Sequence, residues 1–351
     1  MFRGRNLTLS VYGTSHGPAV GCLLTGVPAG IKIDYERIDS AMNLRKTGGK
    51  YASKRKEEDR VEFISGVNEG FTTSEPILIT IQNQDGKRKD YSFLPDIPRP
   101  GHQDMLMNIR SSGNADLSGG GSSSARLTAG IVAAGALLEQ VLIDNEVKIL
   151  AQVSEIGEIK ATSLDAKASI TNQEVYDSVR CYDEEAGYSM MQLLDEVRRE
   201  KDSIGSKVEA LICNMPIAEG GQWFDGLEST FASAMMAIPA ARGVEFSKGF
   251  DAVRMKGSEH NNAWIKENGK ITQEGENPDG IIAGLTTGSP IRIGVAFKPP
   301  SSIAKAQNTL NLETGEVEKL QVKGRHDPVI APRAVAVVRA MSILVVSDYL
   351  I

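Results

Sequence analysis

Short segments rich in Val, Ile and Leu alternate along this chain with Ala- and Leu-rich or capped helical segments, and this alternation constrains the fold most. Seven of the short segments are bounded by Gly, Pro or Asn, as strands are. The predicted strands are 7–12, 20–24, 61–64, 77–81, 147–153, 207–213 and 291–297. The predicted helices are 34–44, 124–143, 190–201, 227–237 and 331–346. Alternating strands and helices favour a layered α/β or α+β fold over an all-α or all-β one.

A similar unit occurs twice in the sequence. Residues 26–30 form a proline-containing turn between a predicted strand and the helix that begins near Asp34. Residues 214–218 form another between a predicted strand and the helix near Leu227. The repeat predicts a pseudo-duplicated core, although strand–turn–helix units also recur by chance in α/β proteins. The polar stretches 155–188 and 260–277 are predicted insertions, and the sequence has no convincing domain boundary, so we expect a single domain over 1–351.

Composition excludes several classes of protein. The formal net charge of −6 argues against a general nucleic-acid binder. No apolar stretch has the roughly 20 clean residues of a membrane span, and no signal peptide is evident. The three cysteines show no CxxC spacing, which indicates reduced thiols and argues against a metal site. We therefore expect a cytoplasmic protein with no membrane or nucleic-acid partner.

All four histidines of the chain fall in polar or glycine-containing loops. His16 follows Ser15 in the loop 13–17, His102 lies in 99–104 between Arg99 and Asp104, and His326 precedes Asp327 in 324–328. The fourth, His260, lies in 257–262. Any one of these histidines can be a solvated turn residue. Together they indicate acid–base chemistry next to an anion, because imidazole titrates near neutral pH.

Three further segments suit an anion. Residues 118–126 combine consecutive glycines and serines with Arg126 just before a predicted helix, so backbone N–H groups and a guanidinium can converge. A flexible linker is the alternative, but an Ala-rich helix follows at once. Lys298 precedes Ser301 and Ser302 at the end of a strand, and 45–56 is a basic run in an acidic chain. A solvated loop and a solvated charge run are about equally plausible for these two segments.

The ordered set of motifs resembles the chorismate synthase family. The resemblance rests on 13–17, 99–104, 118–128, 243–250, 297–303 and 325–328, with shorter matches at 65–67, 90–92 and 238–240. No single motif is specific, but their order spans nearly the whole chain. The resemblance implies an α+β fold of β-α-β sandwich layers.

The activity that the resemblance implies is a lyase reaction of the shikimate pathway, the last common step of aromatic amino-acid biosynthesis. The enzyme would convert 5-enolpyruvylshikimate 3-phosphate to chorismate and phosphate by trans-1,4 elimination. Its cofactor would be reduced FMN, which is not consumed overall, and its assembly a homotetramer. The chain has no evident pyridine-nucleotide fingerprint, so a separate reductase or the reduced flavin pool would supply the flavin.

The resemblance also implies roles for individual residues. His16 would protonate the departing phosphate, and His102 would act near N1 of the flavin. Ser15 and Asp327 would form a proton relay near N5. The residues that would clamp the substrate's phosphate and carboxylates are Arg45, Arg126 and Arg325. The residues that would lie at the flavin are Ser123, Ser124, Asn261, Lys298, Ser301 and Ser302.

Several positions differ from the family pattern, and two alternatives follow. The altered positions are Thr14, Ser122, Leu127, Ile131, Asp279 and Ala283, of which Ser122 and Ile131 stand where the family has arginine. A divergent paralogue that binds flavin or another anion without this activity is one alternative. The other is a GHMP-type small-molecule kinase, because 119–125 resembles the phosphate loop of that family. A kinase would leave the histidine-containing motifs without a role.

Overall fold

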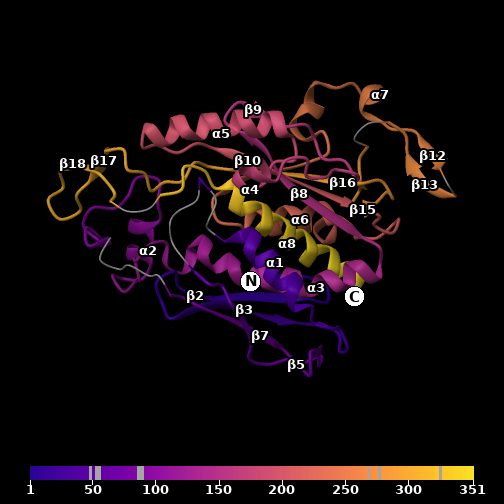
Figure 1. Ribbon diagram of the computed structural model, residues 1–351, viewed down its shortest axis with the longest axis horizontal. Coiled ribbons are helices and arrows are strands. Elements are labelled where there is room, and N and C mark those ends of the chain that lie inside the picture. The colour runs from indigo at the N-terminus through magenta and orange to yellow at the C-terminus, as the bar shows by residue number, and fades with distance from the viewer. Residues whose placement is uncertain (47–49, 52–56, 85–90, 268, 276–277, 324–325) are drawn as a thin grey trace.

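Two five-stranded antiparallel sheets enclose a layer of helices in the computed structural model of the chain (Figure 1). The structure describes residues 1–46, 50–51, 57–84, 91–267, 269–275, 278–323 and 326–351. The first sheet has the order β1-β2-β3-β7-β4, formed by Phe2–Arg3, Thr8–Gly13, Ala19–Thr25, Ile77–Gln82 and Val61–Phe63. The second has the order β11-β16-β10-β8-β9, formed by Ala241–Phe246, Ile291–Phe297, Ser206–Cys213, Lys148–Ile156 and Ile159–Lys160. The predicted α+β fold with β-α-β layers is confirmed.

The helical layer contains the most apolar helices of the described chain. It consists of α1 (Tyr35–Arg45), α3 (Thr128–Asp144), α6 (Leu227–Met236) and α8 (Ala331–Leu350). Helices α3 and α8 are buried on nearly all sides, as expected of helices between two sheets. They approach closely at Gly135, where a Cβ would lie 2.7 Å from the Cβ of Ala340. One described helix, Ala125–Asp144, has the length and hydropathy of a membrane span, and 78% of that window is buried inside the protein.

The predicted pseudo-duplication is confirmed by the topology. The first half runs β2-β3-α1-β4-β7-α3, and the second runs β8-β10-α6-β11-β16-α8. Their sheets have the matching orders β2-β3-β7-β4 and β8-β10-β16-β11. Each half therefore contributes two equivalent connections at one end of its sheet. The connection α1–β4 corresponds to α6–β11, and the connection β7–α3 corresponds to β16–α8.

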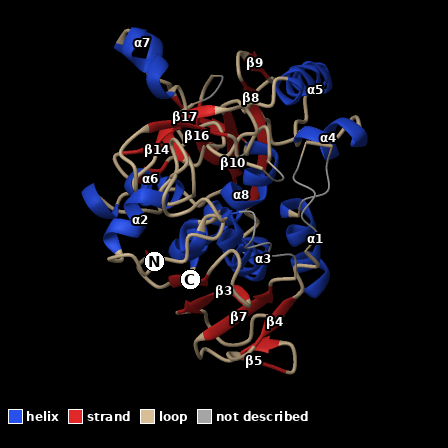
Figure 2. Ribbon diagram, turned by 90° about the vertical axis from the view of Figure 1, so that its left-hand side faces the viewer, coloured by secondary structure: helices blue, strands red, loops and turns tan. Residues whose placement is uncertain are grey.

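Further helices and hairpins lie around this core. Helices α4 (Gln173–Val179) and α5 (Glu184–Arg199) lie beside the β9 edge of the second sheet (Figure 2). Helix α2 (Asp104–Arg110) and the hairpin β17–β18 (Gln307–Leu310 and Val317–Leu320) lie at one end of the molecule. Helix α7 (Gly257–His260) and the hairpin β12–β13 (Trp264–Glu267 and Lys270–Gln273) project at the other end (Figure 1). Two-stranded pairs also form between β5 (Val67–Asn68) and β6 (Phe71–Thr72), and between β14 (Ile281–Ile282) and β15 (Leu285–Thr286).

All seven predicted strands and all five predicted helices are present, although several bounds differ; α8, for example, extends to Leu350. The helix expected at 124 begins at Thr128, because 121–127 form two short 3-10 turns. The helix expected at 190 begins at Glu184, where the Asp183 side chain caps it. The stretch 155–188 is not a plain insertion, because it contains the end of β8, all of β9 and α4, and the start of α5.

Candidate active site

A cavity of about 630 Å³ lies where the equivalent connections of the two halves meet. The first half contributes the loop after β2, the end of α1 with the approach to β4, and the β7–α3 connection. The second half contributes the α6–β11 turn and the β16–α8 connection. Its volume is in the range of small-molecule sites. The site is therefore a product of the internal duplication.

The cavity concentrates positive charge in an acidic chain. Eight of its lining residues are cations: Arg45, Lys46, Arg99, Arg126, Arg242, Lys298, Lys323 and Arg333. Three are carboxylates: Glu57, Asp59 and Asp327. The net charge of the whole chain is −6, so this excess is local. Such a cavity attracts a small molecule with several negative charges.

Ser15 and His16 form a hydrogen-bonded pair at the end of β2. The distance from Ser15 Oγ to His16 Nδ1 is 2.9 Å, and Ser15 Oγ also lies 3.1 Å from the Ser118 carbonyl. The ring of His16 packs edge-on against Tyr91. Gly119 approaches the pair from the β7–α3 connection at a φ of +67°, and a Cβ there would lie 2.6 Å from His16 Cε1. Only glycine allows this approach.

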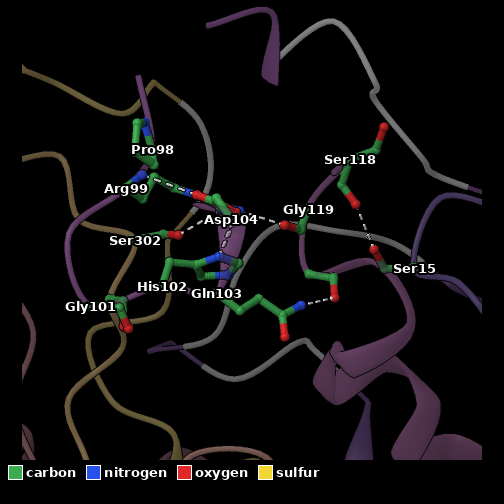
Figure 3. A network of polar contacts seen from close by, with 12 residues as sticks. Ser15, Pro98, Arg99, Gly101, His102, Gln103, Asp104, Ser118, Gly119 and Ser302 are labelled. Atoms are coloured by element: carbon green, nitrogen blue, oxygen red, sulfur yellow. Dashed lines mark hydrogen bonds and ion pairs between the residues drawn. The ribbon is translucent and has the colours of Figure 1, made fainter. Parts of the chain in front are cut away.

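Arg99 connects the two halves of the site (Figure 3). It is buried and donates from Nε and from a terminal nitrogen to both oxygens of Asp104, at 2.8 and 2.6 Å. It also donates to the Gly119 carbonyl at 2.5 Å and to Ser302 Oγ, on the other half, at 3.0 Å. The bidentate pair fixes the guanidinium plane, so Arg99 is a scaffold for the residues around it.

His102 is oriented by Asp104. His102 Nδ1 lies 2.6 Å from Asp104 Oδ1 and 3.1 Å from a terminal nitrogen of Arg99. Nδ1 can either donate a hydrogen bond to the Asp104 carboxylate or accept one from the Arg99 guanidinium. The contact with Asp104 is the shorter of the two, so we assign the Nδ1 proton to the bond with Asp104. Burial would raise the pKa of Asp104, but hydrogen bonds from Arg99 and His102 outweigh it and hold that pKa well below its ordinary value. The carboxylate is therefore ionised beside His102.

Asp59 lies between two buried arginines. Arg45, at the end of α1, donates to Asp59 Oδ2 at 2.6 Å, and Arg126 donates to Asp59 Oδ1. Burial lowers the pKa of Arg45 to about 10, partly offset by Asp59 and reinforced by Arg333 and Arg126. Burial opposes ionisation of Asp59, but the two arginines hold the pKa of its carboxyl below the ordinary value. These charges form one coupled group in the cavity wall.

The second half supplies further groups along the β16–α8 connection. Lys298 Nζ and Ser301 Oγ both donate to the Gly101 carbonyl, at 2.7 and 2.8 Å. Burial, and then the charge of Arg242, lower the pKa of Lys298. Arg333, in the first turn of α8, donates to Asp327 at 3.0 Å. Its Nε is buried and has no hydrogen-bond partner among the described residues.

The structure brings most of the predicted site residues to this cavity. The predicted residues that line it are Ser15, His16, Arg45, His102, Ser123, Ser124, Arg126, Lys298, Ser301, Ser302 and Asp327. Arg325 lies outside the described residues, as do residues 52–56 of the basic run. Asn261 does not line the cavity, because it ends α7 in the projecting arm. Of the two residues of the expected relay, Ser15 contacts His16, and Asp327 contacts Arg333.

Sequence reasoning missed four residues of the site. Arg99 and Asp104 were part of a motif, but their bidentate pair was not predicted. Arg333 lies six positions after Asp327, outside the motif 324–328, and was not predicted to pair with it. Asp59 gave no usable signal, because it ends an acidic run after a basic one and its partners are 14 and 67 positions away.

Comparisons with known proteins agree with this geometry. The family model described as chorismate synthase matches residues 7–351. A chorismate synthase of Aeropyrum pernix is 43% identical over 349 residues, covering 99% of this chain and 92% of that protein. Chorismate synthases of Korarchaeum cryptofilum and Methanosarcina mazei are 41% and 40% identical, covering 99% of this chain and 96% and 95% of their own lengths.

A solved structure is also similar. The crystal structure of a chorismate synthase matches with a TM-score of 0.75 at 27% identity, covering 99% of this chain and 92% of that chain. The match extends through both halves of the duplicated core, and the sequence relatives extend through every motif loop that lines the cavity. The chain therefore belongs to the chorismate synthase family.

Proposed function

We propose that this chain converts 5-enolpyruvylshikimate 3-phosphate to chorismate and phosphate by trans-1,4 elimination, with reduced FMN as its cofactor. The observation that carries the proposal is the combination of a Ser15–His16 pair with a local excess of cations, including buried arginines, in one cavity. Elimination of phosphate needs charge neutralisation at the leaving group and delivery of a proton to it. The relatives named chorismate synthase support the same reaction.

The cations account for binding of the substrate, which carries a phosphate and two carboxylates. Arg45 and Arg126 line the cavity, and we propose that Arg325 joins them in the clamp. Arg45 Nε is buried without a hydrogen-bond partner among the described residues, as is Arg333 Nε. Buried donors of this kind are costly unless a ligand uses them. An anion in the cavity would satisfy them.

The donor set on the other side of the cavity fits reduced FMN. An electron-rich flavin has a polar ring edge and a phosphate, and Lys298, Ser301 and Ser302 offer a cation and hydroxyls within one short segment. His102, held by Asp104, would lie at the N1 side, and Ser123 and Ser124 would complete the flavin-binding set within this cavity. When bound, the reduced flavin supplies the electron density that eases loss of the allylic phosphate.

The remaining residues would handle protons. His16 would protonate the departing phosphate, and its bond to Ser15 fixes which ring nitrogen is engaged within the protein. Ser15 and Asp327 would relay the proton removed from the substrate, since both line the same cavity. Arg333 donates to Asp327 at 3.0 Å and would hold that carboxylate in position for the relay.

An anaerobic assay with reduced FMN and 5-enolpyruvylshikimate 3-phosphate tests this proposal. His16→Ala and Asp327→Ala should each lower kcat by about 10²-fold or more, the usual size of acid–base contributions, with little change in the Kd of FMN. His260→Ala is the matched control, because His260 does not line the cavity. Folded, flavin-loaded wild-type protein that releases no chorismate would contradict the proposal and favour a binding protein. ATP turnover would favour the kinase.

We further propose a cytoplasmic homotetramer in which each chain is one domain over 1–351, supplied with reduced flavin by a separate reductase or the cellular pool. Exposed apolar side chains on the second half support self-association: Trp223, Phe224, Phe250, Val253 and Trp264. Light scattering should then give four times the chain mass of 37.8 kDa, and a monomer at assay concentration would contradict the tetramer.

A further inference from the structure

A single carboxylate joins two arginines that come from distant parts of the first half. Asp59 precedes β4, Arg45 ends α1, and Arg126 lies in the 3-10 turn before α3. Each carboxylate oxygen accepts from a different guanidinium, at 2.6 Å from Arg45 and in a short contact from Arg126. The three residues are 3%, 2% and 5% exposed, in that order. All three line the cavity.

The guanidiniums of Arg126 and Arg45 differ in their remaining contacts. Arg126 is also held by Asn83 Oδ1 at 2.8 Å, the Gln82 carbonyl at 3.3 Å and, at 3.8 Å, Glu57. Arg45 has only the bond to Asp59, and its Nε has no partner among the described residues. One side chain is therefore locked, while the other keeps a buried donor available.

Two buried guanidiniums repel one another, and within the trio the single carboxylate of Asp59 faces both of them, while Glu57 lies 3.8 Å from Arg126. The trio therefore keeps a net positive charge beside the cavity. Asp59 also has a φ of +53°, a conformation that non-glycine residues adopt at some cost. Asp59 thus adopts an unfavourable backbone conformation, and in that conformation its carboxylate reaches both arginines.

We propose that Asp59 is a positioning residue that holds Arg45 and Arg126 side by side as a preformed receptor for the phosphate group of the substrate. It acts through the two arginines, since its own negative charge repels the anion. Its contribution is pre-organisation, because the receptor does not have to order two long side chains when the anion arrives. The inference rests on the proposed function for the identity of the substrate, but not for the binding of phosphate.

Isothermal titration with inorganic phosphate tests the receptor without turnover. Asp59→Asn removes the charge that orients both guanidiniums and should weaken phosphate binding at least about tenfold, the size of a lost charge-assisted hydrogen bond. In the elimination assay the same variant should raise the KM of the substrate more than it lowers kcat. The Kd of FMN should not change. Glu209→Gln is the matched control, because Glu209 is a buried partner of Arg292 that does not line the cavity.

A purely neutralising role predicts the opposite result. If Asp59 only compensated buried charge, Asp59→Asn would leave the cavity more positive, and phosphate would bind equally well or more tightly. That outcome would overturn the proposal. A third outcome separates the two proposals. If Asp59→Asn weakens phosphate binding but the wild-type protein makes no chorismate, the receptor is supported and the proposed function is contradicted.

Two further variants keep the test decisive. Asp59→Asn combined with Arg126→Lys should weaken phosphate binding by less than the product of the two single effects, because both changes break the Asp59–Arg126 contact and only Asp59→Asn also releases Arg45. Additive effects would overturn the proposal.

If Asp59→Asn does not fold, Asp59→Glu keeps the charge but moves the oxygens by one methylene. Tenfold weaker phosphate binding in that variant supports positioning, and wild-type affinity overturns it.

Discussion

Gly119 places backbone against His16, which we expect to protonate the leaving group, and against Ser15, which we expect to relay the proton removed from the substrate. Its φ is +67°, and an added Cβ would lie 2.6 Å from His16 Cε1 and 2.9 Å from Ser15 Oγ. Gly119→Ala should therefore separate Ser15 from His16. We expect kcat to fall at least about tenfold, the lower side of what acid–base groups contribute. The anaerobic elimination assay measures the change.

Gly113→Ala is the matched control for that substitution. Gly113 has a φ of +85°, but a Cβ there would meet no atom within 4 Å. Both variants therefore introduce the strain of a left-handed alanine, roughly 1 kcal/mol, and only one of them displaces the pair. Equal losses of kcat in the two variants would mean that strain, not contact with His16, is responsible.

The residues predicted from sequence are those whose signal is local. His16, His102 and Asp327 could be singled out because each lies in a short motif with a rare residue type. The resemblance then assigned their roles. The pairing of Asp104 with Arg99 was missed although both lie in one motif, whereas Asp59 was missed because what it does depends on partners brought to it by the fold. For Asp59 these partners lie on two other elements, which no local pattern reveals.

At the scale of elements, α5 begins where a carboxylate caps it. Asp183 accepts from the backbone of Ala186 at 3.0 Å, and from the backbone and hydroxyl of Thr162 at 2.9 and 2.7 Å. Those hydrogen bonds, that of the Thr162 backbone first, lower the pKa of Asp183 below its ordinary value of 3.8. A lowered folded-state pKa means that the stabilisation is complete above about 3.8 and is lost as the pH falls through the folded value.

Asp183→Ala should lower the free energy of unfolding by about 1 kcal/mol at pH 7, as loss of an N-cap does. The difference from wild type should shrink as the pH falls below about 3.8 and through the lower folded-state pKa, because the wild-type carboxyl itself then becomes protonated. Urea unfolding at pH 7 and below pH 3.8 measures it. Asp39→Ala, on the exposed face of α1, should show no such pH dependence. A difference that grows towards acid pH would contradict the cap.

Elements with strong local patterns were predictable, and those formed by tertiary pairing were not. The strand at 291–297 was predicted to the residue, because buried Ile, Val and Phe side chains alternate along it with other residues. Strand β11 was missed, since Ala241–Phe246 contains Arg242, Gly243 and Glu245 and becomes a strand by pairing with β16. The short helix α2 was missed because the proline- and glycine-containing motif before it read as a loop.

At the scale of the whole molecule, duplication explains where the site lies and why it is asymmetric. The same two connections of each half meet at the cavity, but they carry different chemistry. The first half supplies the Arg45–Asp59–Arg126 group, and the second supplies Lys298 with the Asp327–Arg333 pair. Two equivalent frameworks thus form one site with unlike walls, which suits a substrate and a cofactor bound side by side.

Because α3 packs against α8, we expect the two halves to unfold as one cooperative unit, and hydrogen exchange can test this expectation. Ile79 in β7 belongs to the first sheet and is fully buried. Ile79→Ala should lower the free energy of unfolding by about 2–5 kcal/mol. If the halves unfold together, the slowest amides of β10, in the second sheet, should exchange faster by the same factor as those of β3.

Ile271→Ala is the matched control, because Ile271 is exposed on β13 in the projecting arm. It should leave the slowest amides of both sheets unchanged. Faster exchange confined to the first sheet in Ile79→Ala would instead mean that each half unfolds alone, and it would contradict a single domain over 1–351. Unfolding as one unit follows from the core itself, since buried side chains of both halves form one continuous apolar cluster between the sheets. Neither half could keep its face of α3 or α8 out of water without the other.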